Sequence, residues 1–426
     1  MKKMKLLFIP FMGMLLAGCS GASAAKDSLD GGYVEGVPGG GSEGIPDVDP
    51  DAYVPSSDGE GYTLEGGKES GSGDEEPTEE QIKIEPGQLT CSALDDNKYY
   101  DYWKSLSVSN QEGKGIFQNY HDEFAFNTFH RLDLTIKNGN NITVSLNGEN
   151  AVTKVDNFNK AYLFPSRDLE RYSVTISYVD QAGTSKTIQK EVVNGDEIDL
   201  EAQKDISNNI EIMFVIDATG SMGDEMRYIQ EEINDVISQV KKDNANANLT
   251  LAMMVYRDTG DQYVTRYSDF TTDYVKQQEF LSKQSANGGG DFEEAVEVAM
   301  KEAMEKQWSE NSTKLLFHVA DAPAHDNKVS SWNQSALLAA QKGIKIITVA
   351  SSGIDKKTEY FFRSQSLLTA GQYVYLTNHS GIGGEHLDAT VQEQLVVEYL
   401  NKCLIRLIDG YVTGEMAEPI SYVQQQ

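Results

Sequence analysis

The sequence predicts an α/β protein built on a doubly wound, mostly parallel sheet, preceded by a small β-sandwich and a disordered acidic tether. Three observations support this prediction. In residues 208–412, unbroken apolar runs alternate with amphipathic segments of helical spacing, the pattern of buried parallel strands joined by helices. In residues 131–203, apolar and polar residues alternate, which is typical of half-buried strands. Residues 20–86 contain too little apolar surface to form a core.

The chain has 426 residues and a formal net charge of −30. This length accommodates about two or three domains. Because so negative a chain repels phosphate groups, we expect no nucleic-acid partner. The three cysteines, Cys19, Cys91 and Cys403, are too few for a disulfide framework or a four-ligand zinc site. For Cys91 and Cys403 the sequence is compatible with a bridge in an oxidising compartment and with two buried free thiols.

Residues 1–19 have the three parts of a secretory signal peptide. Lysines at the start are followed by the apolar run LLFIPFMGMLLA, and the segment closes with Leu-Ala-Gly before Cys19. The apolar run is too short to span a membrane as a helix. The ending resembles the bacterial lipobox, which implies cleavage before Cys19 and acylation of that residue, so that the lipid anchors the protein. Ser20 favours an outer-membrane or cell-surface location, and a plain secretory signal is the alternative.

Residues 20–86 are predicted to be a disordered, acidic, glycine-rich linker. The segment is dominated by Gly, Ser, Pro, Asp and Glu, and it cannot bury enough apolar surface to offset the entropy lost on ordering. Like charges along it repel one another and extend it. We therefore expect it to hold the folded part away from the membrane.

Residues 87–130 are predicted to form a helical segment that packs on its neighbours. Aromatic and apolar side chains recur there at helical spacing, namely Tyr99, Tyr102, Trp103 and Leu106. The alternative is a carbohydrate-binding platform made of Tyr99, Tyr100, Tyr102 and Trp103.

Residues 131–203 are predicted to form a small β-sandwich. Short alternating strands such as RLDLTIK and YSVTISYV are separated by Asn-Gly and Gln-Ala-Gly turns. The segment resembles the immunoglobulin-like and carboxypeptidase-regulatory-like modules of extracellular bacterial proteins. No residue in it suggests chemistry, so we expect it to act as a spacer or support.

The α/β domain is expected to occupy residues 208–412, and residues 413–426 are expected to form a tail. Strands are predicted at residues 210–217, 249–256, 314–320, 343–350 and 373–376, with an edge strand at 263–270. Helices are predicted at residues 224–240, 272–284, 292–308, 332–342, 356–369 and 391–408. Strands that alternate with helices in this way form a doubly wound sheet.

The stretch IEIMFVIDATGSMG at residues 210–223 is the centre of the predicted domain. An apolar strand ends at Asp217, and Thr219 and Ser221 follow at alternate positions of the loop. At the carboxyl end of a parallel strand these side chains enter a crevice, where a carboxylate and two hydroxyls converge. Such hard oxygen donors suit Mg²⁺ or Ca²⁺. The alternative is a simple strand-to-helix turn in which a hydroxyl caps the helix.

The motif Asp-Ala-Thr-Gly-Ser-Met resembles the D-x-S-x-S signature of von Willebrand factor type A domains, with Thr219 in the first serine position. That signature forms a metal-ion-dependent adhesion site. The resemblance therefore implies that Asp217, Thr219 and Ser221 are direct metal ligands.

Asp291 follows three glycines and is predicted to open the next helix. The family normally presents a threonine ligand from this loop, so an aspartate here is a departure. The sequence is similar to a subgroup of bacterial and kinase-associated type A domains with Tyr-Arg-Asp after the second strand and Gly-Gly-Gly-Asp before this helix. We predict a metal ligand, and the alternative is an N-cap residue favoured by the helix dipole.

Asp321 ends the strand at residues 314–320 and matches the last ligand of the family's site, which often acts through a water. His325 and Asp258 are expected just outside the ligands, and an ordinary surface position is the alternative for His325. Carboxylates meeting in one crevice repel one another without a cation. The extra charge of Asp291 should strengthen cation binding and weaken attraction for a partner's carboxylate.

We predict no catalytic residue and no enzymatic activity. The loop lacks the first glycine of G-x-S-x-G, no histidine is placed to activate Ser221, and no phosphate-binding or H-E-x-x-H motif is present. The expected function is Mg²⁺- or Ca²⁺-dependent binding of a protein or other extracellular macromolecule by a lipid-anchored cell-envelope protein. The alternatives are a metal-assisted hydrolase with His325 or Asp258 as base, and a structural envelope protein without a functional metal.

Overall fold

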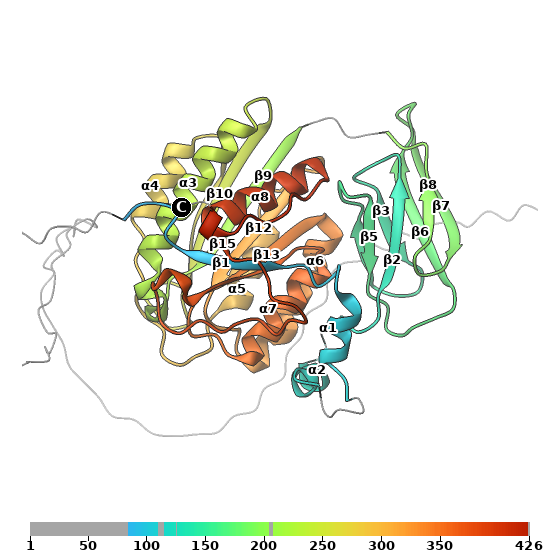
Figure 1. Ribbon diagram of the computed structural model, residues 1–426. Coiled ribbons are helices and arrows are strands. Elements are labelled where there is room, and N and C mark those ends of the chain that lie inside the picture. The colour runs from blue at the N-terminus through green and yellow to red at the C-terminus, as the bar shows by residue number, and fades with distance from the viewer. Residues whose placement is uncertain (1–83, 110–114, 125, 204–207, 425–426) are drawn as a thin grey trace, which may run out of the picture. The chain divides into compact units, whose positions relative to one another are not determined.

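The computed structural model describes residues 84–424, except for residues 110–114, 125 and 204–207 (Figure 1). The predicted signal peptide, Cys19 and nearly all of the predicted linker lie outside the described residues. Among the helices that are described, each is too short or too polar to cross a membrane.

An eight-stranded sheet forms the core of the α/β domain, with the strand order β11-β10-β9-β12-β13-β14-β1-β15. The strands are β9 (Asn209–Asp217), β10 (Asn248–Tyr256), β11 (Thr265–Thr271), β12 (Thr313–Ala320), β13 (Ile344–Ala350), β14 (Tyr373–Leu376), β1 (Thr90–Leu94) and β15 (Glu398–Tyr399). Five neighbouring strands, β10, β9, β12, β13 and β14, run parallel to one another. Strands β11, β1 and β15 pair antiparallel with their neighbours. The predicted doubly wound, mostly parallel sheet is confirmed.

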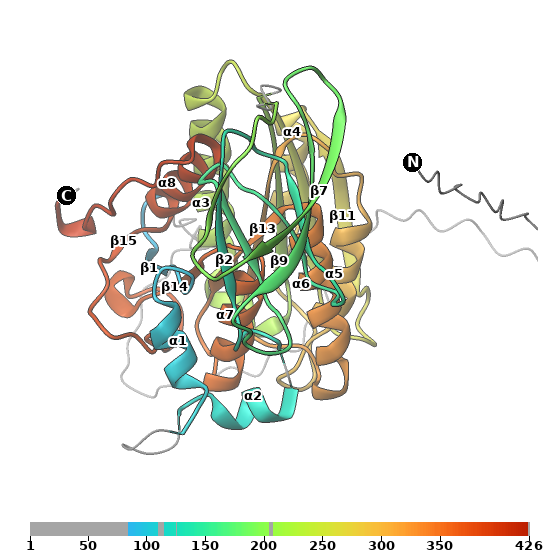
Figure 2. The ribbon, with the colours of Figure 1, turned by 90° about the vertical axis from the view of Figure 1, so that its right-hand side faces the viewer.

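Helices cover both faces of this sheet (Figures 1 and 2). The apolar core on one face includes residues of α3 (Met226–Asp243), α4 (Tyr274–Ser282) and α8 (Leu400–Thr413). The core on the other face includes residues of α5 (Val296–Glu305), α6 (Val329–Lys342) and α7 (Lys356–Leu368). Successive side chains of the central strand β9 enter the two cores alternately, which is why its sequence is apolar without a break after Glu211.

Strand β1 lies within residues 87–130, where the sequence analysis expected only helix. It is inserted between β14 and β15 and pairs antiparallel with both. The carboxylate of Glu232 on α3 accepts hydrogen bonds from the backbone N–H groups of Gly87, Gln88 and Leu89, at 2.8, 2.8 and 3.0 Å. A segment far from the rest of the domain in sequence therefore completes its sheet.

The predicted aromatic helix is present as α1 (Tyr100–Leu106), and a second short helix, α2 (Gln118–Phe124), follows it. Trp103 is buried and stacks on Tyr360 of α7, with ring centroids 5.8 Å apart and the planes at 9°. The aromatic stripe thus packs on a neighbouring element. Because Tyr100 and Trp103 are both buried, the four aromatic residues do not form an exposed platform.

The β-sandwich consists of a three-stranded sheet, β5-β2-β8, and a four-stranded sheet, β4-β3-β6-β7. Its strands are β2 (Leu132–Lys137), β3 (Thr143–Leu146), β4 (Val152–Lys154), β5 (Lys160–Leu163), β6 (Tyr172–Val179), β7 (Ser185–Val192) and β8 (Glu197–Asp199). Asp156 of the sandwich forms an ion pair of 3.5 Å with Lys345 at the start of β13, and both side chains are buried. Asn157 donates a hydrogen bond of 2.8 Å to the carbonyl oxygen of Tyr411 near the end of α8.

Two predicted helix starts are wrong, and in both cases strand pairing displaces the helix. The helix predicted from residue 292 begins at Val296, because Glu294 forms a β-bridge with Ala324 and its N–H donates to the carbonyl of Pro323 at 2.9 Å. The helix predicted from residue 391 begins at Leu400, because the residues before it lead into β15, which pairs with β1. Backbone pairing with distant strands overrides local helical spacing.

The two cysteines of the described residues are Cys91 on β1 and Cys403 on α8, and both are buried free thiols. Of the two possibilities compatible with the sequence, the structure has the unbridged pair. Burial, together with a hydrogen bond to the neighbouring Cys403, raises the pKa of the Cys91 thiol.

Candidate metal centre

The loop after β9 gathers the first three predicted ligands. Asp217 is 0 % exposed, and its Oδ1 atom accepts hydrogen bonds from the backbone N–H of Thr219 at 2.9 Å and from its Oγ1 at 2.6 Å. Thr219 Oγ1 and Ser221 Oγ lie 3.2 Å apart. Asp217 Oδ2 is buried without a hydrogen-bond partner. One carboxylate oxygen of Asp217 is thus held by the loop, while the other accepts no hydrogen bond from it.

Asp321 directly follows β12, which is the parallel neighbour of β9. Asp321 and Asp217 therefore lie at the same edge of the sheet. Its side chain is buried, and its Oδ1 atom has no hydrogen-bond partner. Burial and the Asp217 carboxylate raise the pKa of Asp321 to about 7, although a hydrogen bond from Ser221 acts in the opposite direction. Burial also raises the pKa of Asp217 to about 6. The two carboxyl groups therefore share one poorly solvated crevice.

Glu294 is a member of this group that sequence reasoning missed. It is 2 % exposed, and its Oε2 atom is buried without a partner. Burial, followed by the charges of Asp217, Asp258 and Asp321, raises the pKa of Glu294 to about 9. In the sequence, the burial of Glu294 is indicated only by the apolar residues Ala295 and Val296 that follow it, both of which are buried in the structure.

The glycine-rich loop fits closely between Glu294 and Thr219. Gly289 has a φ of +76°, and a Cβ atom at this position would lie 2.8 Å from Glu294 Oε1 and 3.4 Å from Thr219 Cβ. Its N–H donates to Asp261 Oδ2 at 2.9 Å. Glycine is required here both by the backbone conformation and by the close approach.

Asp291 lies in the loop before α5 rather than in the first turn of that helix. Its side chain is 62 % exposed, and its Oδ2 atom is 3.7 Å from His325 Nε2. The other imidazole nitrogen, Nδ1, is 3.9 Å from Asp258 Oδ1. The structure thus separates the predicted residues into two groups, one around Asp217 and one around His325.

The buried group fits a hard divalent cation. Three carboxylate oxygens of this group lack a hydrogen-bond partner although they are buried, one each from Asp217, Glu294 and Asp321. Arg257, a buried cation beside them, donates instead to the carbonyls of Ala218 at 3.0 Å and Ser285 at 2.8 Å. Buried, unpaired carboxylate oxygens are costly, and a cation held by oxygen ligands removes this cost.

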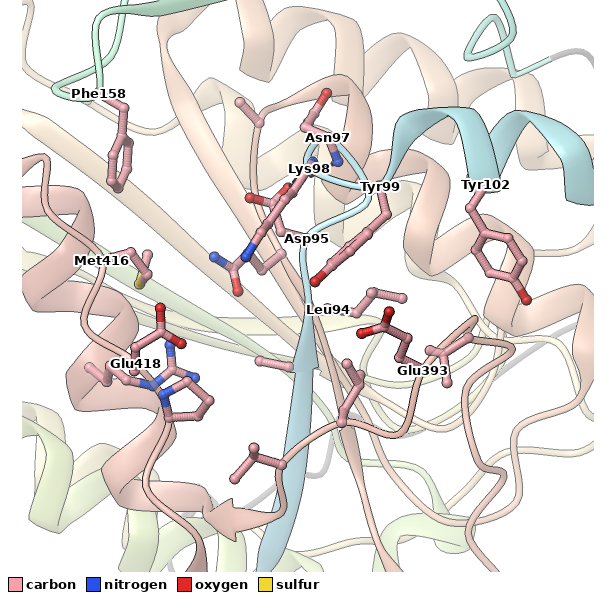
Figure 3. A pocket seen from close by; sticks show the side chains of 18 of the residues that line it. Leu94, Asp95, Asn97, Lys98, Tyr99, Tyr102, Phe158, Glu393, Met416 and Glu418 are labelled. Carbon is pink, nitrogen blue, oxygen red and sulfur yellow. Dashed lines mark hydrogen bonds between the residues drawn. The ribbon is translucent and has the colours of Figure 1, made fainter.

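A separate cavity of about 720 Å³ lies between the end of β1, loops of the sandwich and the chain that follows α8 (Figure 3). Tyr99, Lys98 and Glu393 project into it in this view, and none of the carboxylates of the buried group lines it. Some of the charged residues that line it are already paired: Lys160 forms an ion pair of 3.0 Å with Asp133, and Asp156 forms one of 3.5 Å with Lys345. The metal centre, with its unpartnered oxygens, is therefore the better candidate for function.

Comparisons with known proteins agree with this geometry. Residues 211–387 match the sequence model of the von Willebrand factor A domain. The chain is 28 % identical over 173 residues to the alpha-protein kinase vwkA of Dictyostelium discoideum, covering 39 % of this chain and 27 % of the kinase. It is 25 % identical over 185 residues to an ariadne-like RING finger protein of Acanthamoeba polyphaga mimivirus, covering 39 % of this chain and 18 % of that protein. The matched region is thus less than a third of each relative's length.

Among solved structures, the conserved hypothetical protein BatB from Bacteroides thetaiotaomicron is 15 % identical, with 47 % of this chain and 98 % of that chain covered and a TM-score of 0.34. Domains of the matching family generally mediate adhesion or protein–protein interaction and are usually non-catalytic. The sheet order, the Asp217 loop at its carboxyl edge and the matching family model together show that residues 211–387 of this chain are a von Willebrand factor A domain.

Proposed function

We propose that this A domain binds another protein, or another extracellular macromolecule, through a Mg²⁺ or Ca²⁺ ion held at the carboxyl edge of its sheet. The observation that carries the proposal is the set of buried carboxylate oxygens without hydrogen-bond partners at that edge. A bound cation would supply a positive coordination position for a donor atom of the partner.

The proposed ligands divide into charged and neutral oxygens. Asp217 and Asp321 supply carboxylates from the ends of adjacent parallel strands. Thr219 and Ser221 supply hydroxyls from the intervening loop, and the hydrogen bonds of Thr219 hold Asp217 in place. Glu294 supplies the additional carboxylate that the sequence analysis assigned to Asp291, because it is Glu294 that lies buried beside the others.

A binding role is favoured over hydrolysis. In the described part of the chain, the hydroxyl of Ser221 contacts Thr219 and Asp321, and no histidine is hydrogen-bonded to it. A serine nucleophile needs a base within hydrogen-bond reach. These contacts therefore favour Ser221 as a proposed cation ligand over Ser221 as a nucleophile.

The location proposed for the protein is the cell envelope, at the outer membrane or cell surface, with an acylated Cys19 as its anchor. The support is the signal-peptide pattern that ends in Leu-Ala-Gly-Cys and the acidic linker that follows it. A tether of this composition would place the A domain at a distance from the lipid surface, where a partner can reach it.

Replacing Asp217 tests the metal centre. Calorimetric titration of Mg²⁺ and Ca²⁺ into the chelator-treated protein should show binding in the natural protein and at least about a hundredfold weaker binding in Asp217→Ala, since a carboxylate ligand is lost. Asp224→Ala is the matched control, because Asp224 is an exposed carboxylate of the same loop. Circular dichroism checks that both variants fold. Unchanged ion affinity in Asp217→Ala would refute the site.

A further inference from the structure

Three loops bring Asp258, Asp291 and His325 together next to the proposed adhesion site. Asp258 follows β10, Asp291 precedes α5 and His325 follows β12. One ligand atom from each residue lies within 4.8 Å of the other two. The imidazole of His325 faces a carboxylate on each side, at 3.9 and 3.7 Å, and both distances are too long for a hydrogen bond. We propose that these residues form a second cation site, which binds Zn²⁺.

Two carboxylates, Asp258 in this group and Glu297 beside it, also have a buried oxygen without a partner, which is the second observation that points to a cation. Asp258 Oδ1 is buried without a hydrogen-bond partner, and its side chain is only 14 % exposed. Glu297, in the first turn of α5, is 8 % exposed, and its Oε2 atom is likewise unpartnered. Burial raises the pKa of Glu297, and the nearby charge of His325 acts in the opposite direction, which places Glu297 close to the imidazole. A cation at His325 would offset this concentration of unpaired negative charge.

The loops that carry the site are held side by side by contacts between protein residues. The N–H of Glu294 donates to the carbonyl of Pro323 at 2.9 Å, which joins the segment after Asp291 to the segment before His325. Lys357 on α7 bridges the same two segments, with Glu293 at 2.8 Å and Asp326 at 3.0 Å. This lysine is therefore engaged with the neighbours of the proposed ligands and stabilises their loops. Such preorganisation lowers the cost of bringing the ligands to one ion.

The donor set selects a different ion from that of the adhesion site. Mg²⁺ and Ca²⁺ prefer all-oxygen sites, whereas an imidazole nitrogen with two carboxylates suits Zn²⁺. Three protein ligands leave one position of a tetrahedral ion open. Asp291 lies at the solvent side, since its carboxylate is mostly exposed. The open position is therefore available to water or to a donor atom from a partner.

A Zn²⁺ titration at saturating Mg²⁺ tests this proposal on the mature protein. We expect one Zn²⁺ per chain by calorimetry against a competing chelator, and about tenfold or greater loss of affinity in His325→Ala. Asp291→Asn, at an exposed position, should also weaken binding. His379→Ala, which removes an exposed histidine elsewhere, is the control and should not change it.

The two metal sites can be separated by the same measurements. Asp217→Ala should keep its Zn²⁺ affinity while losing Mg²⁺ affinity, and His325→Ala should show the reverse. Equal Zn²⁺ affinity in the natural protein, His325→Ala and Asp291→Asn would overturn the second site without affecting the first.

Discussion

Thr219 shows how one side chain organises the candidate metal centre at the residue scale. Its backbone N–H and its hydroxyl both bond the same oxygen of Asp217, so that oxygen is fixed and the other is left unpartnered. Gly289 contributes from the opposite side, because its missing side chain leaves room for Glu294 and Thr219. The site thus depends on short-range contacts among residues from two loops.

The buried histidine His318 allows a prediction about the pH dependence of stability. It lies within β12 at 0 % exposure, with Nε2 3.0 Å from the Tyr256 hydroxyl and Nδ1 2.9 Å from Gln365 Nε2. Burial lowers the pKa of His318 to about 3, whereas an unfolded chain has a histidine pKa of about 6.5. Between these values the unfolded state binds a proton that the folded state does not.

His318 should therefore make the free energy of unfolding decrease as pH falls from about 6.5 towards 3, by up to about 1.4 kcal/mol per pH unit. His318→Gln, which keeps polar atoms for both neighbours, should reduce this slope. Urea denaturation at several pH values between about 4 and 7 measures it, with His379→Gln as an exposed control. Parallel pH profiles for the natural protein and His318→Gln would contradict the assignment.

At the scale of elements, strand β1 is the least local part of the sheet. It is contributed by residues before the β-sandwich, yet it pairs with β14 and β15 near the end of the chain. Glu232 of α3 caps the start of this strand by accepting three backbone hydrogen bonds, and its side chain is buried. A single carboxylate therefore couples helix α3 to the insertion of β1.

Removing this carboxylate should destabilise the protein. Glu232→Ala leaves three N–H groups without their acceptor, of which that of Leu89 is buried, and we expect a loss of about 2 kcal/mol in the free energy of unfolding. Glu231→Ala, on the same helix but without a hydrogen bond to this strand, should change it by less than about 0.5 kcal/mol. Urea denaturation compares the two variants, and equal midpoints would show that the cap contributes nothing.

At the scale of the whole molecule, the β-sandwich is inserted between the first strand of the central sheet and the remainder of the α/β domain. The chain passes from β1 through α1 and α2 into the sandwich and returns at β9. The buried ion pair of Asp156 with Lys345 and the bond from Asn157 to the carbonyl of Tyr411 join the sandwich to that domain. The folded unit therefore includes residues well before the expected domain start at 208.

This topology predicts that residues 208–426 alone make a poor domain. They lack β1 and the residue before it, so the burial of Leu89, Cys91 and Leu94 is lost, which costs about 5 kcal/mol. For a domain of this size that corresponds to a melting temperature lower by about 10 °C or more. Thermal denaturation should show this difference against a fragment of residues 84–426. Matching melting temperatures would mean that β1 is dispensable.

The sequence by itself determined the features that depend on neighbours in the chain. Asp217, Thr219 and Ser221 are recognisable because they follow one apolar strand at alternate positions, and Asp321 because it ends another; the α/β sheet follows from the same apolar runs. Only the tertiary structure decided which residues join them. Glu294 is buried there because of its bridge to Ala324, Asp291 is exposed beside His325, and β1 enters the sheet. Each depends on pairing between segments about 30 to 300 residues apart, and such pairing is set by packing of the whole chain and not by local periodicity.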